Sequence, residues 1–470
     1  MDRDNPNIIW VVWDTCRKDF TMTEYQGKEL TPNLSQLSQD SITFSNAFSA
    51  APWTPPSHAS MFTGHYPSSH GYLEDGMELK KPHIAEVLSE HGYDTVSVSS
   101  ASKLSSYTPL SNGFDEMYET FRLPSVGMEN IWKYYGQIAE DWMRFVPQYL
   151  FNRQKMGYLT TSYLKHCIDA VPNGDSLFAF VNYLIPHSGY EPLEPFRSRF
   201  NDPTDNVRDD VVEELSFRGG YRYIAGELSV TDDEWEAVKA RYAGEIAYVD
   251  SLLGHLIDHL KNKGVYDDTM IIVTSDHGEH FGEHNRAYHQ FSLYDELLHV
   301  PLVVKMPDSD FAGRDVSNVV SLTDIFSTIT DIVSIQNISS QGTSIYPPDT
   351  VDREYVFAEY GRPISAIENL QKYAKNTVDQ DLLNSLDVSL QCVRSQDLKL
   401  IEDSKGRYQS FDLCSDPEEQ VNLTENSEPP KSIQPLREAM ESRLSELPEV
   451  RSNVPDETAI EENLKTLGYR

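Results

Sequence analysis

Cysteine is scarce in this 470-residue chain, and its spacing excludes two common ways of stabilising a small fold. The four cysteines lie far apart and form no C-x-x-C pair, standing at Cys16, Cys167, Cys392 and Cys414. The sequence therefore predicts neither a zinc ribbon nor a disulfide framework.

Long apolar runs are missing as well. The longest, residues 7–13 and 177–185, are far shorter than the roughly 20 residues that a helix needs to cross a bilayer. The first residues, MDRDNP, lack the basic and then apolar order of a secretory signal. We therefore expect a soluble, cytoplasmic protein without a membrane span.

Positive charge is the third shortage. The chain has 39 Lys and Arg against 74 Asp and Glu, a formal net charge of −35. A nucleic-acid partner is excluded on this ground, because neutralising phosphates requires basic patches. Self-repulsion of this size is relieved by salt, whose screening length falls to about 3 Å at 1 M. We interpret the composition as adaptation to a salt-rich cytoplasm of the haloarchaeal type; an acidic mesophilic protein is the alternative.

The pattern of apolar residues predicts the fold class. Residues 7–13, 177–184 and 269–274 are nearly continuous apolar runs, as in strands buried on both faces. Apolar residues recur at three- and four-residue steps over 232–261, which predicts a long helix. Because strands alternate with helices, we expect an α/β protein with a mostly parallel central sheet flanked by helices. Ligands of such sheets bind at the carboxyl ends of the strands.

The character of the sequence changes after about residue 380. Three short strands separated by turns are predicted at residues 389–394, 398–402 and 408–413. A helix is predicted over 431–447. We therefore divide the chain into a catalytic α/β domain (1–380), a small antiparallel sheet with one helix (381–450) and a polar tail (451–470).

The most informative stretch is residues 54–71, which read TPPSHASMFTGHYPSSHG. It resembles the sulfatase family of the alkaline-phosphatase-like superfamily. Members carry a cysteine or serine, any residue, proline, serine and arginine, followed at a fixed distance by T-G-x-x-P-x-x-H-G. The frame is reproduced here at Pro56, Ser57, Thr63, Gly64, Pro67, His70 and Gly71. The resemblance covers residues 7 to 447 and implies an alkaline-phosphatase-like fold that hydrolyses sulfate or phosphate esters.

Two departures from the family pattern bear on mechanism. The nucleophile position, normally a cysteine converted to formylglycine, holds Thr54, and His58 replaces the arginine. Threonine cannot become formylglycine, whose geminal diol attacks sulfur with one hydroxyl and expels sulfate with the other. A threonine ester requires direct attack by water, which phosphorus accepts more readily than sulfur. Pro55 and Pro56 predict that a helix starts here, with its N-terminus favouring an anion beside Thr54.

The candidate metal ligands stand at two predicted strand ends. Asp14 follows the first strand, Asp276 and His277 follow a later one, and both positions resemble the metal-binding positions of the family. With the Thr54 oxygen as fourth ligand, these residues would hold one divalent ion. Oxygen ligands favour Ca or Mg, whereas an imidazole shifts the preference toward Mn or Zn.

Three histidines are candidates for contacts with the substrate. His187, in the sequence IPHS after a strand, resembles the P-H histidine of the family, which contacts the substrate or its leaving group. His289 lies near the point where relatives place a lysine or histidine. His58 either takes over the contact of the missing arginine or fills its space. The substrate-binding lysine and histidine of the family's G-K-x-H segment are absent, which predicts a less positive anion pocket.

These features lead to one hypothesis and two alternatives. We expect a metal-dependent hydrolase in which Thr54 attacks a phosphoryl or sulfuryl centre, with phosphodiesters and phosphonates favoured. The substrate would be a small anionic ester or an ester on a glycan or lipid head group. The alternatives are a non-catalytic ligand-binding relative and a transferase that passes the Thr54-bound group to an alcohol. The natural substrate, the metal and the oligomeric state stay open.

Overall fold

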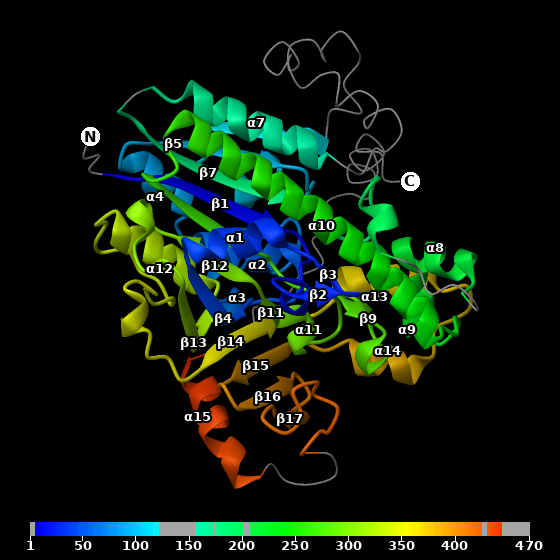
Figure 1. Ribbon diagram of the computed structural model, residues 1–470. Helices are drawn as coiled ribbons and strands as arrows, with labels where there is room; N and C mark the ends of the chain where they lie inside the picture. Colours follow the sequence, from blue (N-terminus) through cyan, green and yellow to red (C-terminus); the bar gives the residue numbers. More distant parts are fainter. Residues whose placement is uncertain (1–4, 122–155, 173, 201–206, 425–429, 444–470) are drawn as a thin grey trace.

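The structure is a computed structural model that describes residues 5–121, 156–172, 174–200, 207–424 and 430–443. Its largest element is a central sheet, which within those ranges has nine strands (Figure 1). Eight follow one another in the order β11 (His299–Val300), β4 (Ile42–Phe48), β12 (Leu302–Lys305), β8 (Thr269–Thr274), β1 (Asn7–Trp13), β7 (Ser176–Tyr183), β5 (Tyr93–Ser99) and β6 (Glu116–Glu119), while β13 (Arg314–Ser321) pairs with β4.

Most strand pairs of this sheet are parallel. β1 runs parallel to both of its neighbours, β7 and β8, and β5 runs parallel to β6 and β7. β12 is antiparallel to both β4 and β8. The predicted α/β class with a mostly parallel sheet is confirmed. The carboxyl ends of β1 and β8 therefore lie side by side.

Helices cover both faces of the sheet, which explains why its central strands are apolar throughout. All seven residues of β1 are buried. One face packs against α1 (Pro32–Gln39), α7 (Gly157–Ala170) and α10 (Asp232–Lys263). The other packs against α2 (Thr54–Thr63), α4 (Ile84–Glu90) and α12 (Thr323–Ile332). Each large apolar side chain buried in this way contributes about 1.5–3 kcal/mol.

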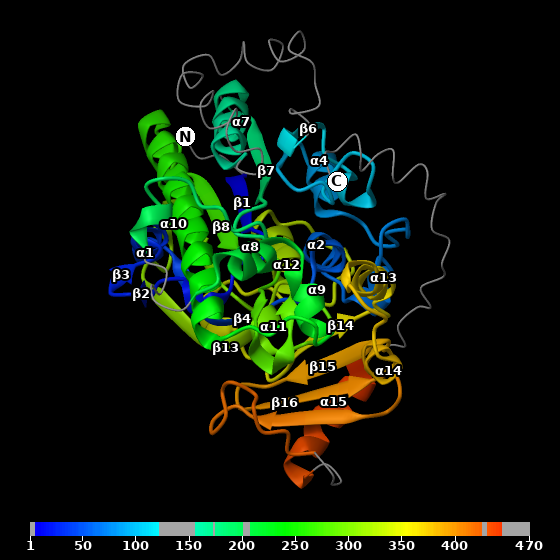
Figure 2. The same ribbon diagram turned by 90° about the vertical axis from the view of Figure 1, so that its right-hand side faces the viewer.

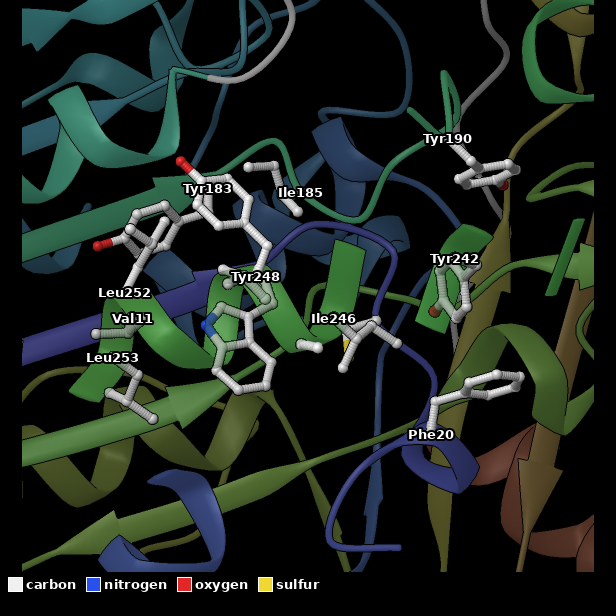
Figure 3. Close-up of a cluster of buried hydrophobic side chains, with 14 of the residues drawn as sticks. Val11, Phe20, Tyr183, Ile185, Tyr190, Tyr242, Ile246, Tyr248, Leu252 and Leu253 are labelled. Atoms are coloured by element: carbon white, nitrogen blue, oxygen red, sulfur yellow. The ribbon is translucent and has the colours of Figure 1, made fainter. Parts of the chain in front are cut away.

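The long helix α10 shows how the sequence defines one of these layers. It begins with a capping box in which Thr231 and Glu234 satisfy each other's backbone amides, and it ends at Gly264, whose φ is 73°. Its apolar side packs on β1, and Figure 3 shows Val11 beside Leu252 and Leu253 of the helix. The predicted helix over 232–261 is confirmed and extends two residues further.

A second, antiparallel sheet stands beneath the central one (Figure 2). Its strands, in order, are β14 (Val356–Tyr360), β15 (Leu390–Arg394), β16 (Leu398–Asp403) and β17 (Tyr408–Asp412). α15 (Gln434–Arg443) covers one face through Leu436 and Met440. The predicted small antiparallel sheet with a helix is confirmed, and it draws β14 from the segment before residue 380. The predicted polar tail, 451–470, lies outside the described residues.

Two regions without a clear sequence pattern form short helices. α8 (Asp209–Phe217) and α9 (Gly219–Ile224) precede α10, and α13 (Ile364–Tyr373) and α14 (Gln380–Leu386) connect β14 to β15. All four lie on the side of the molecule toward which β1 points (Figure 1). In the described ranges, no helix combines the length and the apolar character that a membrane crossing requires.

Candidate active site

The predicted metal ligands come together at the carboxyl edge of the central sheet. Asp14 follows β1 directly, and Asp276 and His277 follow β8, the strand beside it. One ligand atom from each of the three residues lies within 4.8 Å of the other two, and all three side chains are buried. Parallel pairing of β1 and β8 brings these residues together across more than 260 positions of sequence, as Thr15 N donates to Asp276 Oδ1 at 3.1 Å.

Thr54 reaches the same point from the other layer. It is the first residue of α2, and its Oγ1 lies 3.3 Å from Nε2 of His277. Pro55 and Pro56 occupy the next two positions of the first turn. Their fixed φ favours the helix, but proline has no backbone N–H to donate. The Thr54 amide is thus the one N–H donor among these three residues. The helix dipole adds to it in favouring an anion.

The polar atoms at the centre of the site are left unsatisfied by the protein. Asp14 Oδ1 and Asp276 Oδ2 are buried and have no hydrogen-bond partner in the described part of the chain. The Nδ1 of His277 lies 2.9 Å from the carbonyl oxygen of Gly278 and donates to it, so Nε2 keeps a lone pair directed to the site. Two carboxylate oxygens and one imidazole nitrogen with unused lone pairs match the donor set of a divalent cation.

Electrostatics supports the same interpretation. Burial raises the pKa of Asp14 well above its usual range, and the charges of Asp276 and Glu279 add to the rise. Burial lowers the pKa of His277 to about 4, which keeps its imidazole neutral at pH 7. A buried carboxylate without a counter-charge is costly, whereas a cation between the carboxylates would remove the cost.

A ring of hydrogen bonds fixes the two strand ends against α2. Asp276 Oδ1 accepts from the amides of Thr15 and His277, at 3.1 and 3.0 Å. Ser57 of α2 donates its hydroxyl to the backbone oxygen of Asp276 at 2.7 Å. Thr15 has a φ of 64°, in the left-handed region that costs a β-branched residue about 1–3 kcal/mol. Local strain of this kind is typical of functional sites.

His58 lies behind the nucleophile and not at the open side of the site. It is fully buried, and its Nδ1 donates to the backbone oxygen of Thr54 at 2.9 Å. The same atom is 3.5 Å from Asp276 Oδ2. Burial lowers the pKa of His58, so a neutral imidazole stands where the family carries a guanidinium. Its contacts join the first turn of α2 to a metal-ligand position.

His187 and His289 line one side of the site together. The ring centroid of His289 lies 4.7 Å from that of His277 and 5.2 Å from that of His187. Both His187 and His289 are half-buried. The structure thus brings all seven site residues predicted from sequence into one region, with His58 on its inner side.

Glu279 is the residue of this site to which the sequence assigned no role. Its carboxylate is fully buried, and it accepts from His289 Nδ1 and from the hydroxyl of Tyr190, both at 2.9 Å. The bond to Nδ1 fixes the tautomer of His289 and leaves Nε2 available to a substrate. The signal was present in the D-H-G-E motif, because a carboxylate two residues after a metal ligand stays near the same strand end.

The fold and the site together define an alkaline-phosphatase-like ester hydrolase. Residues 6–335 match the family described as Sulfatase, and the chain belongs to that family. As a member it is a hydrolase of sulfuric or phosphoric esters.

Individual relatives and solved structures agree with this assignment. The chain is 26% identical to arylsulfatase K of Bos taurus over 456 residues, covering 89% of this chain and 78% of that protein. It is 23% identical over 359 residues to the multifunctional alkaline phosphatase superfamily protein PehA of Trinickia caryophylli, covering 64% and 68%. The phosphonate monoester hydrolase of Agrobacterium radiobacter has a similar fold, with a TM-score of 0.70 and 21% identity over 93% of this chain and 94% of that one.

Proposed function

We propose that this protein is a metal-dependent ester hydrolase with Thr54 as its nucleophile. The observation that carries the proposal is the position of Thr54 Oγ1, 3.3 Å from His277 Nε2 at the start of α2. This hydroxyl stands beside two buried carboxylates whose oxygens lack partners in the described ranges. A hydroxyl placed beside a cation site and a helix N-terminus is activated as a nucleophile.

Asp14, Asp276 and His277 would hold the cation, with the Thr54 oxygen completing the set. When bound, a divalent ion supplies Lewis acidity that lowers the pKa of the hydroxyl and polarises the ester oxygen. Calcium, magnesium, manganese and zinc all fit carboxylate oxygens, and the imidazole ligand favours manganese or zinc.

The reaction of this chain's own residues has two steps. The Thr54 hydroxyl gives its proton to solvent, and Oγ1 forms a bond to phosphorus or sulfur as the bond to the leaving oxygen breaks. The leaving oxygen takes a proton from a nearby histidine. Water then attacks the Thr54 ester and gives a proton to that histidine, while the Thr54 oxygen leaves and takes a proton from solvent, which releases the acid and restores the hydroxyl. His289 is the better placed proton donor, because its hydrogen bond to Glu279 through Nδ1 orients the ring and leaves Nε2 for the substrate.

His187 is better suited to hold the substrate as a neutral hydrogen-bond partner. Burial lowers its pKa, and repulsion from His289 adds to this effect. His58 would orient Thr54 from behind through its bond to the Thr54 backbone. These roles assign one contact to each of the three histidines.

Phosphorus is the favoured reacting centre. The second step depends on direct attack by water, since threonine offers no second hydroxyl that could expel the product. Phosphodiesters and phosphonates accept that attack, whereas sulfate esters normally require the formylglycine route. The relatives include proteins named arylsulfatase and one named multifunctional, so both ester types belong in the test. An anionic ester on a small molecule, glycan or lipid head group is the substrate class that we propose.

The experiment compares two chromogenic esters, bis(4-nitrophenyl) phosphate and 4-nitrophenyl sulfate, at molar salt with Mn²⁺ or Ca²⁺. We expect faster turnover of the phosphodiester and loss of turnover with EDTA. Faster turnover of the sulfate would refute the preference for phosphorus. Turnover unaffected by EDTA would refute the proposal that activity depends on a metal ion. Adding an alcohol such as glycerol and analysing the products distinguishes a hydrolase from a transferase.

We also propose that the protein works at molar salt. The net charge of −35 repels itself at low ionic strength, and concentrated counterions remove most of this repulsion. Thermal unfolding between 0.1 and 3 M KCl checks this: the midpoint should rise steadily with salt, whereas a flat profile would favour an ordinary acidic protein.

A further inference from the structure

A four-residue helix joins the two halves of the candidate active site. α11 (Asp295–Leu298) accepts from the metal-ligand turn, since Gly278 N donates to Leu297 O at 2.8 Å. It also accepts from the segment that leads to Thr54, since Ser49 N donates to Leu298 O at 2.8 Å. The approach at Gly278 is so close that a Cβ there would collide with the backbone oxygen of Glu296. The position of α11 therefore sets the positions of both segments.

Side-chain contacts close this arrangement into a ring. The hydroxyls of Ser49 and Ser57 lie 3.0 Å apart, and Ser57 donates to the backbone oxygen of Asp276 at 2.7 Å. All three residues are buried. The metal-ligand turn, the start of α2 and α11 are thus linked to one another by hydrogen bonds, so a shift of α11 is transmitted to both reacting parts of the site.

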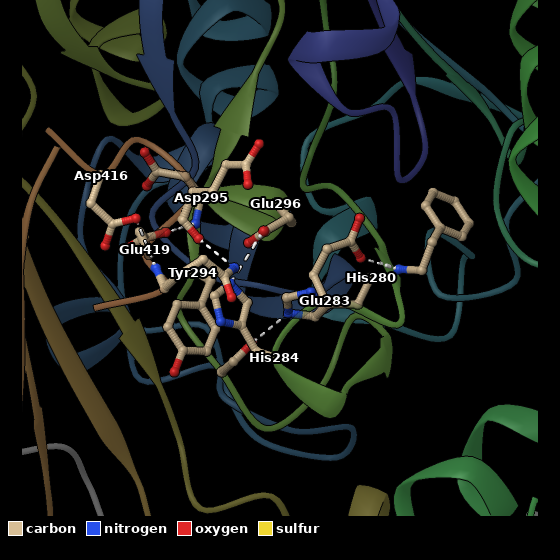
Figure 4. A network of polar contacts seen from close by, with 12 residues as sticks. His280, Glu283, His284, Tyr294, Asp295, Glu296, Asp416 and Glu419 are labelled. Carbon is tan, nitrogen blue, oxygen red and sulfur yellow. Dashed lines mark hydrogen bonds and ion pairs between the residues drawn. The ribbon is translucent and has the colours of Figure 1, made fainter. Parts of the chain in front are cut away.

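The first residue of α11, Asp295, is held by the C-terminal sheet and the segment after β17. Four charged residues make this contact, and we name them the interdomain charge cluster: half-buried Asp295 and the buried Arg394, Lys399 and Glu419. Lys399 Nζ lies 2.7 Å from Asp295 Oδ1 and 2.8 Å from Glu419 Oε1. Arg394 Nε lies 3.0 Å from Asp295 Oδ2. Glu419 also accepts from the Asp295 amide at 2.6 Å, and Figure 4 shows these two carboxylates side by side.

The geometry of the interdomain charge cluster is restrictive because water does not reach its centre. The side chains of Lys399 and Glu419 are 0% and 1% exposed. A buried charge that loses its partner is strongly destabilising, so small displacements of the sheet against α11 are opposed.

The same sheet contacts the segment before Thr54 at two further places. The guanidinium carbon of Arg394 lies 4.1 Å from the ring centroid of Phe48, the last residue of β4. The amide of Glu359, in β14, donates to Ala50 O at 2.9 Å. Both contacts flank Ser49, so the C-terminal sheet holds this segment directly as well as through α11.

We infer that Arg394, Lys399 and Glu419 are positioning residues of the active site. Through Asp295 and α11 they fix the distance between the metal-ligand turn and Thr54, so the C-terminal sheet is part of the catalytic apparatus. This inference rests on the proposed function for its effect on catalysis. Its structural content, the coupling of Lys399 to the Gly278 and Ser49 amides, is measurable without any activity.

The first experiment measures that coupling by hydrogen exchange in the full-length protein. Lys399→Met removes the charge and keeps the aliphatic length, and Arg407→Met is the matched control. Arg407 lies in the turn between β16 and β17 of the same sheet, is 55% exposed, and pairs with Asp403 of the same hairpin. We expect peptides containing Ser49 and Gly278 to exchange about tenfold faster in Lys399→Met and unchanged in the control. Faster exchange confined to β15–β17 would overturn the inference.

The second experiment separates positioning from stability by kinetics well below the unfolding midpoint. We expect Lys399→Met to lower kcat and the Mn²⁺ affinity by about tenfold to a hundredfold, as losing an outer support of a metal ligand does, with KM nearly unchanged. A variant with a lower midpoint but wild-type kcat and Mn²⁺ affinity would show a merely structural role. If the wild type hydrolyses no ester, the proposed function fails, and the exchange experiment still decides the coupling.

Two further variants keep the test decisive if Lys399→Met does not fold. Glu419→Gln retains an oxygen that accepts from the Asp295 amide and removes one charge, so the same peptides should respond more weakly. The double variant Lys399→Met/Glu419→Gln removes one charge of each sign. It should recover part of the loss in Lys399→Met, whereas additive losses would contradict a charge-paired positioning cluster.

Discussion

The metal-ligand residues and the interdomain charge cluster each contain two carboxylates, but only in the second region does the protein supply cationic side chains to pair with them. At the first, oxygens of Asp14 and Asp276 have no partner in the described ranges. At the second, Asp295 and Glu419 face Arg394 and Lys399 at 2.7–3.0 Å. Both regions contact α11, the first through Gly278 and the second through Asp295.

The pKa values of Asp14 and Asp295 follow this difference, whereas nearby histidines and backbone amides lower the pKa of Asp276 and burial raises that of Glu419 to about 7. Burial and neighbouring charges raise the pKa of Asp14 well above its usual range. Burial also acts to raise the pKa of Asp295, but Arg394 and Lys399 outweigh it and hold this pKa below the usual range. Asp295 is charge-paired as the chain folds, whereas Asp14 would gain a counter-charge only from a bound cation. A buried carboxylate without a counter-charge is typical of functional sites.

The largest effect is expected from removing the Thr54 hydroxyl, which lies beside the metal-ligand residue His277. Thr54→Ala should lower hydrolytic activity by about 10³-fold or more, since no other hydroxyl replaces the nucleophile. The unfolding midpoint should change little. Steady-state kinetics on the phosphodiester measures this, and Thr54→Ser, which keeps the hydroxyl, should retain most activity. Equal activity in Thr54→Ala and wild type would favour a non-catalytic relative.

A change in the interdomain charge cluster should lower the stability of the fold. Asp295→Asn leaves Arg394 and Lys399 with one carboxylate between them, and we expect a loss of about 3–5 kcal/mol in the free energy of unfolding. Chemical denaturation at constant high salt measures it. Asp387→Asn is the control, because Asp387 forms an exposed ion pair with Arg362, and such pairs contribute about 1 kcal/mol or less. Similar losses in the two variants would contradict the comparison.

Removing a carboxylate from the metal-ligand residues should have the opposite effect and raise the free energy of unfolding. Asp14→Asn removes an uncompensated buried charge, so the metal-free protein should gain roughly 2–4 kcal/mol at pH 7–8. The variant should also lose the stabilisation that Mn²⁺ gives to the wild type. Denaturation with EDTA and with Mn²⁺ measures both effects. A destabilised, metal-free Asp14→Asn protein would show that Asp14 has a counter-charge after all.

The difference between the regions also explains what the sequence revealed. Asp14 and the Asp276-His277 pair stand directly after apolar strands, and parallel strands end at one edge, so their convergence was predictable. The interdomain charge cluster was not. Asp295, in the helix α11, lies 104 residues from Lys399 in β16 and 124 from Glu419 in the segment after β17. No local periodicity relates such positions.

Two other features depended on packing that no short pattern expresses. The role of Glu279 became evident only when His289 and Tyr190 were seen to share its carboxylate. The five-residue strand β14 pairs with β15 in the C-terminal sheet although it precedes residue 380. The helices α13 and α14 separate the two strands in the sequence. Chain order alone had separated β14 from its partner.

One further buried carboxylate, that of Glu359, is intermediate between the two regions and gives the smallest expected effect. Glu359 is fully buried and is bound only by neutral donors: the Ser68 amide at 2.7 Å and the Gln391 side chain at 2.9 Å. Burial raises its pKa from 4.5 to about 7, against the lowering effect of these hydrogen bonds. Its position has neither the cations of the interdomain charge cluster nor the open cation site of Asp14.

The stability of the wild type should therefore fall with rising pH relative to that of Glu359→Gln. The folded protein binds the Glu359 proton more tightly than the unfolded chain, so between these two pKa values the native state holds more protons and loses stability as pH rises. With about 1.4 kcal/mol per pKa unit, the difference between wild type and variant should change by about 2 kcal/mol from pH 5 to pH 6.5. Glutamine suits this position. The oxygen of the introduced amide accepts from the Ser68 backbone amide, and its nitrogen donates to the side-chain oxygen of Gln391 once the Gln391 amide is rotated. Denaturation of both proteins across this range measures the change, and parallel pH profiles would mean that Glu359 is ionised in the native state at pH 5.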